Sequence, residues 1–151
     1  MNPTQDTIIL PFQPENQVEV KELILAGLAE HWGTMDSSMN PDLDAIGLTY
    51  AKAVFLVAWD QGKIVGTGAL IPESSDTARI VRMSVAAEMR RNGVGSKILQ
   101  RLCEQAKSMG YQRLVLETVD TWQEAIAFYK RFGFQITDYL DGDVHFALHL
   151  S

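Results

Sequence analysis

The chain has 151 residues, of which 46 % are hydrophobic and 21 % are charged. This composition is ordinary for a soluble globular protein and argues against a disordered chain. We expect one compact domain over residues 1–151, because the length allows one core but not two. The formal net charge of −6 disfavours nucleic acid and anionic membrane surfaces as partners, since both are negatively charged.

The sequence also predicts a cytoplasmic location. Residues 1–6 lack the basic start and the apolar stretch of a secretion signal, and no apolar run reaches the ~20 residues that a membrane-spanning helix needs. Cys103 is the single cysteine, so no internal disulfide can form, as in a reducing compartment. We interpret Cys103 as a small buried side chain on a helix rather than a nucleophile, because free cysteine is usually buried.

The first half of the chain predicts four strands and one helix. The helix lies within residues 15–33, and its apolar positions recur at helical spacing: Val20, Leu23, Ile24, Leu28 and Trp32. Residues 34–47 are polar and acidic and predict a loop, with or without one helical turn. Residues 60–62 predict the turn of a hairpin between the second and third strands. The four strands are Thr7–Phe12, Val54–Trp59, Lys63–Ile71 and Ala78–Val85.

The second half predicts two helices and three strands. One helix covers Gly95–Met109 and ends at Gly110, and the other covers Thr121–Phe132 and ends at Gly133. Asp141-Gly142 predicts a tight turn between the last two strands. The strands are Arg113–Val119, Phe134–Leu140 and Asp143–Leu150. Strands and helices in this order predict an α/β domain with a mixed sheet.

The segment MRRNGVGSKIL (Met89–Leu99) places two arginines and two glycines where a strand passes into a helix. The start of a helix presents unpaired N–H groups and the positive end of the helix dipole, and glycine lets a ligand approach the backbone. The spacing Arg90-x-x-Gly93-x-Gly95 lacks the third glycine of a dinucleotide-binding turn and the Gly-Lys-Ser/Thr of a P-loop. By itself, the turn is compatible with a phosphate site and with a purely structural helix start.

Three segments in order, RIVRMSV (79–85), RRNGVG (90–95) and YKRFGF (129–134), resemble the GCN5-related N-acetyltransferase (GNAT) superfamily. The resemblance is close from about Gly66 to Ile136 and looser before it. It implies an α/β (α+β) single-domain fold with a central mixed, mostly antiparallel sheet of six to seven strands flanked by helices. It also implies an enzyme that moves an acetyl group from acetyl-CoA, its co-substrate, to a primary amine of a small molecule through a tetrahedral intermediate, without a metal.

The resemblance assigns the cofactor to the strand end and the glycine turn. It implies that the main chain of residues 83–85 pairs with the pantetheine arm as an added strand would. The amides of residues 91–96 would hold the pyrophosphate, and Arg90, in the signature position, would add positive charge together with Arg91. The implied cofactor-binding residues are Met83, Ser84, Val85, Arg90, Arg91, Asn92, Gly93, Val94, Gly95 and Ser96.

The catalytic residue that the resemblance implies is Tyr129. A tyrosine, with a pKa near ~10, can give a proton to a leaving thiolate or donate a hydrogen bond to it. Tyr129 also shares one helical face with Trp122, Ala125 and Ile126, which is the spacing of a core residue. Relatives often carry an asparagine where this chain has Trp122, so that cofactor contact is in doubt and the indole can instead pack on the sheet.

The base and the acceptor stay open at this stage. Candidate bases are Glu73, Glu117, His31 and His145, and a chain of waters would make a dedicated base unnecessary. The resemblance implies an acceptor pocket along the first helix and the following loop, where acidic side chains either attract a cationic amine or are simply solvated. This region holds Glu30, His31, Asp36, Asp42 and Asp44. The expected partner is a small-molecule amine, with the protein a monomer or homodimer, and the alternatives are a protein amine as acceptor or a non-catalytic acyl-CoA sensor.

Overall fold

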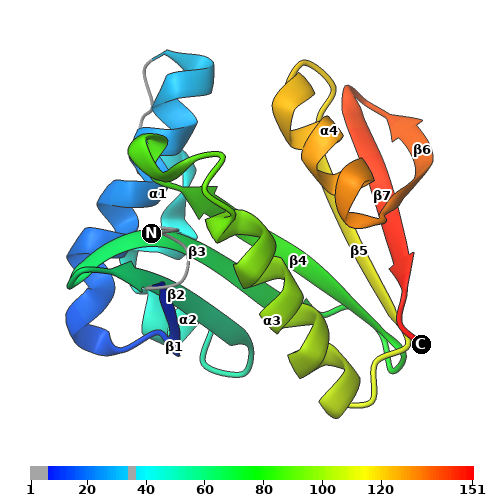
Figure 1. Cartoon of the computed structure of the whole chain (residues 1–151), viewed down its shortest axis with the longest axis horizontal. Coiled ribbons are helices and arrows are strands. Elements are labelled where there is room, and N and C mark those ends of the chain that lie inside the picture. Colours follow the sequence, from blue (N-terminus) through cyan, green and yellow to red (C-terminus); the bar gives the residue numbers. More distant parts are fainter. Residues whose placement is uncertain (1–6, 34–36) are drawn as a thin grey trace.

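The computed structural model describes residues 7–33 and 37–151. In these residues seven strands form one sheet in the order β1-β2-β3-β4-β5-β7-β6 (Figure 1). Neighbouring strands are antiparallel except β4 and β5, which are parallel. The strands are β1 (Ile8–Pro11), β2 (Val54–Asp60), β3 (Lys63–Pro72), β4 (Thr77–Val85), β5 (Arg113–Val119), β6 (Gln135–Leu140) and β7 (Asp143–His149). The expected mixed, mostly antiparallel sheet flanked by helices is confirmed.

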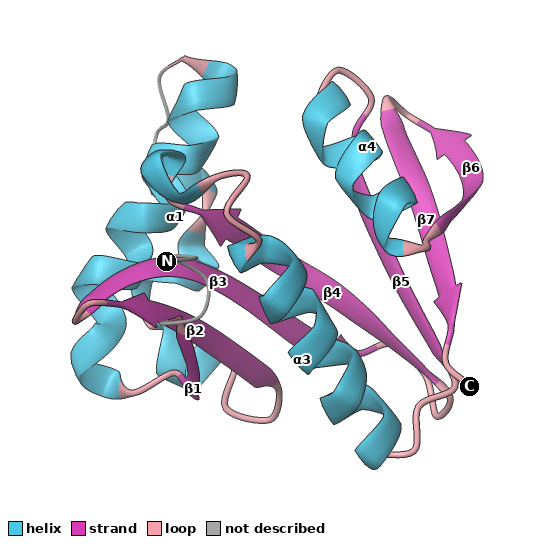
Figure 2. Ribbon diagram, viewed as in Figure 1, coloured by secondary structure: helices cyan, strands magenta, loops and turns pink. Residues whose placement is uncertain are grey.

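Helices cover both faces of the sheet (Figure 2). The helices are α1 (Gln17–Trp32), α2 (Ile46–Thr49), α3 (Val94–Ser108) and α4 (Gln123–Phe132). Single helical turns lie at Pro14–Asn16, Ser37–Met39, Pro41–Asp44 and Ala87–Met89. The acidic segment after α1 therefore contains more helical turns than the one that the sequence allowed for.

The two faces of β2 show how the core is divided. Leu56 and Ala58 belong to the apolar cluster under α3, whereas Phe55 and Val57 belong to the cluster under α1 and α2. This alternation is expected, because successive side chains of a strand point to opposite faces. Both helix layers thus bury an apolar face against the sheet, and the sheet holds their ends in fixed positions.

Two glycines of β3 set how closely α3 approaches the sheet. A Cβ at Gly66 would lie 2.8 Å from Cδ1 of Ile98, and one at Gly68 would lie 2.6 Å from Cγ2 of the same residue. Since real Cβ atoms do not come so close to a neighbour, only glycine admits the helix at this depth. The close packing places the first turn of α3 beside the end of β4.

The sheet opens between β4 and β5. The two strands pair only from Thr77–Arg79 to residues 113–115, and beyond these residues they diverge (Figure 1). On the other side of β4, pairing with β3 continues to Val85, with an irregularity opposite Thr67–Ala69. The strand β4 therefore has one paired edge and, beyond Arg79, one edge without a neighbouring strand.

Candidate active site

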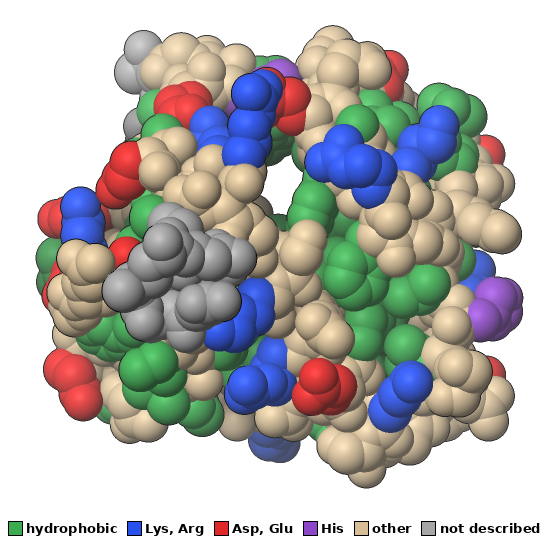
Figure 3. All heavy atoms as spheres, viewed as in Figure 1, with side chains coloured by type: hydrophobic (Ala, Val, Ile, Leu, Met, Phe, Trp, Pro, Cys, Tyr) green, Lys and Arg blue, Asp and Glu red, His purple; other side chains and the backbone are tan. Residues whose placement is uncertain are grey.

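A cleft of about 910 Å³ lies where β4 and β5 diverge. Its walls come from α1, the end of β4, the first turn of α3, the end of β5 and α4. The space-filling view shows an opening that passes through the molecule at this place (Figure 3). A ligand can therefore reach the cleft from both faces of the sheet.

The glycine turn lies at one end of the cleft and leaves the start of α3 uncapped. Arg91 has φ of 69° and Gly93 has φ of 82°, so two left-handed residues turn the chain into the helix. Among the residues that the structure describes, no side chain caps the start of α3, and residues 93–96 line the cleft. Free N–H groups at the positive end of a helix dipole favour an anion, and phosphate above all.

The structure brings nine of the ten implied cofactor residues to the walls of this one cleft. They are Met83, Ser84, Val85, Arg90, Arg91, Gly93, Val94, Gly95 and Ser96. Asn92 is the exception: it does not line the cleft, and its backbone N–H donates to the Met89 carbonyl at 3.3 Å. Residues 83–85 lie beyond the part of β4 that pairs with β5, so the edge of β4 that faces the cleft can accept an extended ligand as an added strand.

The two arginines of the turn differ in their contacts. Nη1 of Arg90 donates to the Glu30 carboxylate on α1 at 2.5 Å, and its Nε donates to the Val85 carbonyl at 3.3 Å. Within the described residues Arg91 forms no ion pair. Arg90 is thus held by the chain's own carboxylate, whereas the guanidinium of Arg91 is available to a ligand.

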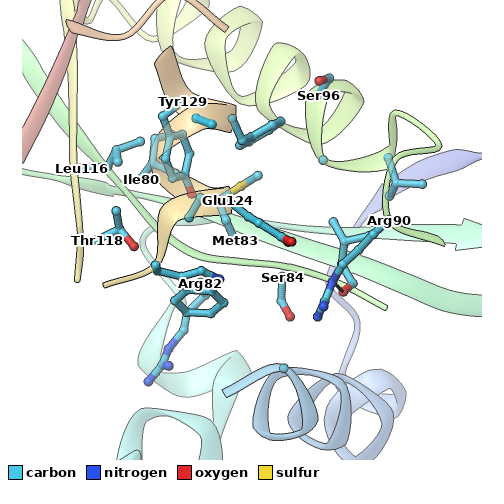
Figure 4. Close-up of a pocket in the computed structure, with 18 of the residues that line it drawn as sticks. Ile80, Arg82, Met83, Ser84, Arg90, Ser96, Leu116, Thr118, Glu124 and Tyr129 are labelled. Atoms are coloured by element: carbon cyan, nitrogen blue, oxygen red, sulfur yellow. Dashed lines mark hydrogen bonds between the residues drawn. The ribbon is translucent and has the colours of Figure 1, made fainter. Parts of the chain in front are cut away.

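Tyr129 lies at the other end of the cleft, on α4 (Figure 4). It is 8 % exposed, and its ring lies 5.1 Å from Phe128, 5.9 Å from Phe134 and 5.7 Å from Phe146, centroid to centroid. Its hydroxyl has no hydrogen-bond partner among the described residues. Burial raises the pKa of Tyr129 well above the ordinary tyrosine value, so the hydroxyl stays protonated and can donate to a ligand in the cleft.

Two of the candidate bases, Glu73 and Glu117, accept hydrogen bonds from one arginine. Arg79 donates from Nε to Glu73 at 2.7 Å and from Nη1 to Glu117. The hydrogen bond from Arg79 lowers the pKa of Glu73, which makes that carboxylate a weaker base. Glu117 lines the cleft, whereas Glu73 and His145 do not. The geometry therefore assigns none of these three residues as a base.

Trp122 lines the cleft and stacks on a residue of α1. Its ring stacks on His31 of α1 with centroids 4.5 Å apart and an interplanar angle of 7°, and Nε2 of His31 lies 3.2 Å from Oγ1 of Thr121. The indole therefore stacks on a side chain of α1, a contact that the sequence did not predict. We call this contact the His31–Trp122 bridge. It includes His31, the third of the candidate bases.

The acidic residues near α1 face cations of the chain itself. Lys21 donates to Asp44 at 2.6 Å, and Arg82 donates to Asp42 at 2.9 Å from Nε and 2.6 Å from Nη2. Asp36 lies outside the described residues. Glu30 and Asp42 thus neutralise Arg90 and Arg82, which line the cleft, rather than forming a free acidic lining for an amine.

Sequence reasoning missed Arg82, which lines the cleft from β4. Its φ of 55° is unusual for an arginine, and its side chain turns toward Asn40 and Asp42 (Nη2 to Asn40 Oδ1, 3.1 Å). Burial alone would raise the pKa of Asp42, but hydrogen bonds from Arg82 and Tyr50 hold it below its usual value. The sequence does carry a signal for this residue. An arginine inside an apolar strand indicates a partly buried charge, and a buried charge requires a partner.

In the part of the chain that the structure describes, no three His, Cys, Asp or Glu side chains gather as ligands of a metal ion. Within the same residues, no helix has the length and apolar character that crossing a membrane requires.

Known proteins match this chain both in sequence and in fold. Residues 20–134 match the model of the acetyltransferase (GNAT) family. The uncharacterized N-acetyltransferase YjgM of Escherichia coli is 32 % identical over 108 residues, which cover 68 % of this chain and 65 % of YjgM. The matched part thus falls short of that relative's full length.

Solved structures share the whole fold at lower identity. A GNAT-family acetyltransferase from Staphylococcus aureus superposes with a TM-score of 0.88 at 23 % identity, over 96 % of this chain and 99 % of that one. The PaiA N-acetyltransferase of Thermoplasma acidophilum, in complex with coenzyme A, superposes with a TM-score of 0.84 at 15 % identity, over 95 % and 98 %.

Proposed function

The chain belongs to the acetyltransferase (GNAT) family, and we propose that it transfers an acetyl group from acetyl-CoA to the primary amine of a small molecule. One arrangement carries the proposal: an uncapped helix start and a protonated tyrosine hydroxyl lie at the two ends of one cleft, along an unpaired strand edge. The helix start would bind an anion, the tyrosine hydroxyl would contact a leaving group, and the strand edge would hold the part of the ligand between them.

The cofactor would run along β4. Its pyrophosphate would accept hydrogen bonds from the N–H groups of residues 94–96, with Arg91 adding charge. Its pantetheine arm would pair with the main chain of residues 83–85. The complex of PaiA with coenzyme A, which has the same fold, supports a cofactor of this kind.

Tyr129 would act on the leaving sulfur. The amine nitrogen attacks the thioester carbon, a C–N bond forms and an oxyanion develops; the C–S bond then breaks as the amine loses a proton and the sulfur leaves as a thiolate. Because burial raises the pKa of Tyr129 far above that of a thiol, the phenol stabilises the thiolate by donating a hydrogen bond rather than by giving up its proton. The proton that the amine releases ends on the thiolate through solvent.

The acceptor must arrive as a neutral amine. An aliphatic amine with a pKa of ~10.4 is mostly protonated at pH 7, which opposes attack by about 4.6 kcal/mol. The carboxylates of Glu30, Asp42 and Glu117 are paired with arginine, whereas Glu124 lines the cleft without such a partner among the described residues. We propose that water in the open cleft carries the proton away. The His31–Trp122 bridge joins α1 to the start of α4 beside the cleft, which supports a small acceptor rather than a folded protein.

A single substitution tests the proposal. A hydrogen bond to a charged group is worth about 1.5–3 kcal/mol, so Tyr129→Phe should lower kcat by about 10- to 160-fold while CoA binding is unchanged. Thiol release from acetyl-CoA with a panel of small amines measures the rate, and calorimetry measures binding. Tyr139→Phe is the matched control, because Tyr139 is 66 % exposed on β6.

Two outcomes would contradict the proposal. A Tyr129→Phe protein with the full rate would remove the tyrosine from the reaction. Binding of acetyl-CoA without thiol release for any amine would favour a sensor over an enzyme.

A further inference from the structure

The inner end of the cleft is closed by two aliphatic side chains. Ile80 and Leu116 are the first residues of β4 and β5 beyond the last paired residues, Arg79 and Val115, and both line the cleft. They are 4 % and 2 % exposed. Figure 4 shows Ile80, Leu116 and Tyr129 at one end of the cleft and Arg90 and Ser96 at the other.

The direction of the proposed cofactor brings its acyl group to this end. With the pyrophosphate at the start of α3 and the arm along residues 85 to 83, the thioester points toward lower residue numbers of β4. That is the direction in which β4 and β5 converge. Any acyl group longer than acetyl therefore extends toward Ile80 and Leu116.

The side chains of Ile80 and Leu116 are packed against buried neighbours and have no space to move into. Ile80 is paired with Leu70 on β3, and Leu116 is paired with Phe146 on β7. Leu70 and Phe146 are 2 % and 1 % exposed, so a row of four apolar side chains crosses four neighbouring strands. Because protein interiors are close-packed, an additional methylene cannot be accommodated by moving one side chain alone.

We propose that Ile80 and Leu116 form an acyl floor that limits the donor to short acyl-CoA thioesters, with acetyl-CoA preferred over propionyl- and butyryl-CoA. The proposal rests on the proposed function, because it needs the cofactor in the cleft. It assigns a specificity role to two residues that have no part in the proposed phosphate site or in the proposed contact with the leaving sulfur. One methylene in an apolar pocket changes selectivity by about 10- to 200-fold, so a steric limit of this kind is large enough to decide the donor.

The test measures binding of CoA, acetyl-CoA, propionyl-CoA and butyryl-CoA by calorimetry, which needs no acceptor. Wild-type protein should bind butyryl-CoA at least tenfold more weakly than acetyl-CoA. Leu116→Ala should reduce this ratio to about threefold or less, and the milder Ile80→Val and Leu116→Val should shift it in the same direction. Leu114→Ala is the matched control: Leu114 is fully buried two residues earlier on β5, is paired with Ala78 and does not line the cleft.

The outcomes separate this proposal from the one on which it rests. If CoA and all three thioesters bind wild-type protein with equal affinity, the acyl floor is refuted while the cofactor site stands. If none of the four binds, the proposed function fails and the acyl floor with it. If Leu116→Ala does not fold, the wild-type ratio and the two valine variants decide, and unchanged ratios in both variants would overturn the proposal.

Discussion

A side chain at Gly95 should block cofactor binding without unfolding the protein. A Cβ built on Gly95 would lie 3.3 Å from Cζ of Phe128 on α4 and 3.5 Å from Cγ2 of Val85 on β4. It therefore points toward those two elements, whose residues Val85 and Phe128 line the cleft. Alanine fits with a shift of a few tenths of an ångström, and its helix preference over glycine, about 0.5–1 kcal/mol, offsets that contact. Valine adds two methyl groups in the path of the pantetheine arm.

The expected size of the effect follows from linkage. CoA at ~100 times its Kd should stabilise wild-type protein by about 2.7 kcal/mol. For a chain of this length each kcal/mol raises Tm by about 2–4 °C, so the rise should be about 5–11 °C. If Gly95→Val weakens binding about a hundredfold, the same CoA concentration gives about 0.4 kcal/mol, or a rise of about 1 °C.

Thermal melts with and without CoA provide the assay. Gly47→Val is the matched control, since Gly47 lies on α2, a Cβ there would be 3.5 Å from Phe12, and the position does not line the cleft. Gly47→Val should keep the full rise in Tm with CoA, whatever it does to the melt of the free protein. A Gly95→Val protein that keeps the full rise would refute the placement of the cofactor at the start of α3.

Three further predictions concern charge and pH. Glu30→Gln removes the ion pair that holds Arg90 and so frees its guanidinium for a phosphate. Because an exposed ion pair is worth about 0.2–1 kcal/mol, calorimetry should show that CoA binds up to about fivefold more tightly to this variant. Weaker binding would contradict the prediction. The pKa of Asp42 is lowered in the folded protein, so its pairing with Arg82 stabilises the fold above the unfolded pKa of ~3.9, and this stabilisation is lost as the pH falls through the folded pKa. In urea unfolding, Asp42→Asn should therefore lower the free energy of unfolding less at pH 3 than at pH 7. An equal loss at both pH values would exclude the ion pair. Because burial raises the pKa of Tyr129, the rate should not decline with rising pH up to about pH 10, and an earlier alkaline decline that Tyr129→Phe removes would contradict this assignment.

Local patterns predicted most of the fold. The strand Arg113–Val119 was predicted at its observed bounds, and the helix after the glycine turn begins one residue earlier than expected. Asp141 and Gly142 have φ of 52° and 85°, as the tight turn between β6 and β7 requires. These features depend on neighbouring residues, which is why spacing and residue type were sufficient to predict them.

Long-range pairing could not be read in the same way. The Arg90–Glu30 and Arg82–Asp42 pairs join residues 60 and 40 positions apart, and they decide which charges in the cleft remain free. The sequence showed the charges but not their partners, because a partner is fixed only when the sheet places two segments together. The glycines of β3 were a usable signal, since glycine inside a strand indicates that another element approaches closely.

The short run of pairing between β4 and β5 has a consequence for the lifetime of the protein. With three paired residues on each strand, a molecule lodged between the diverging strands would replace the missing rungs and join the two parts of the sheet. Amide hydrogens of β5 should then exchange more slowly once the cleft is filled. In a cell, proteases would remove the empty form first. If the proposed cofactor is that molecule, the amount of this protein in a cell would follow the supply of the cofactor.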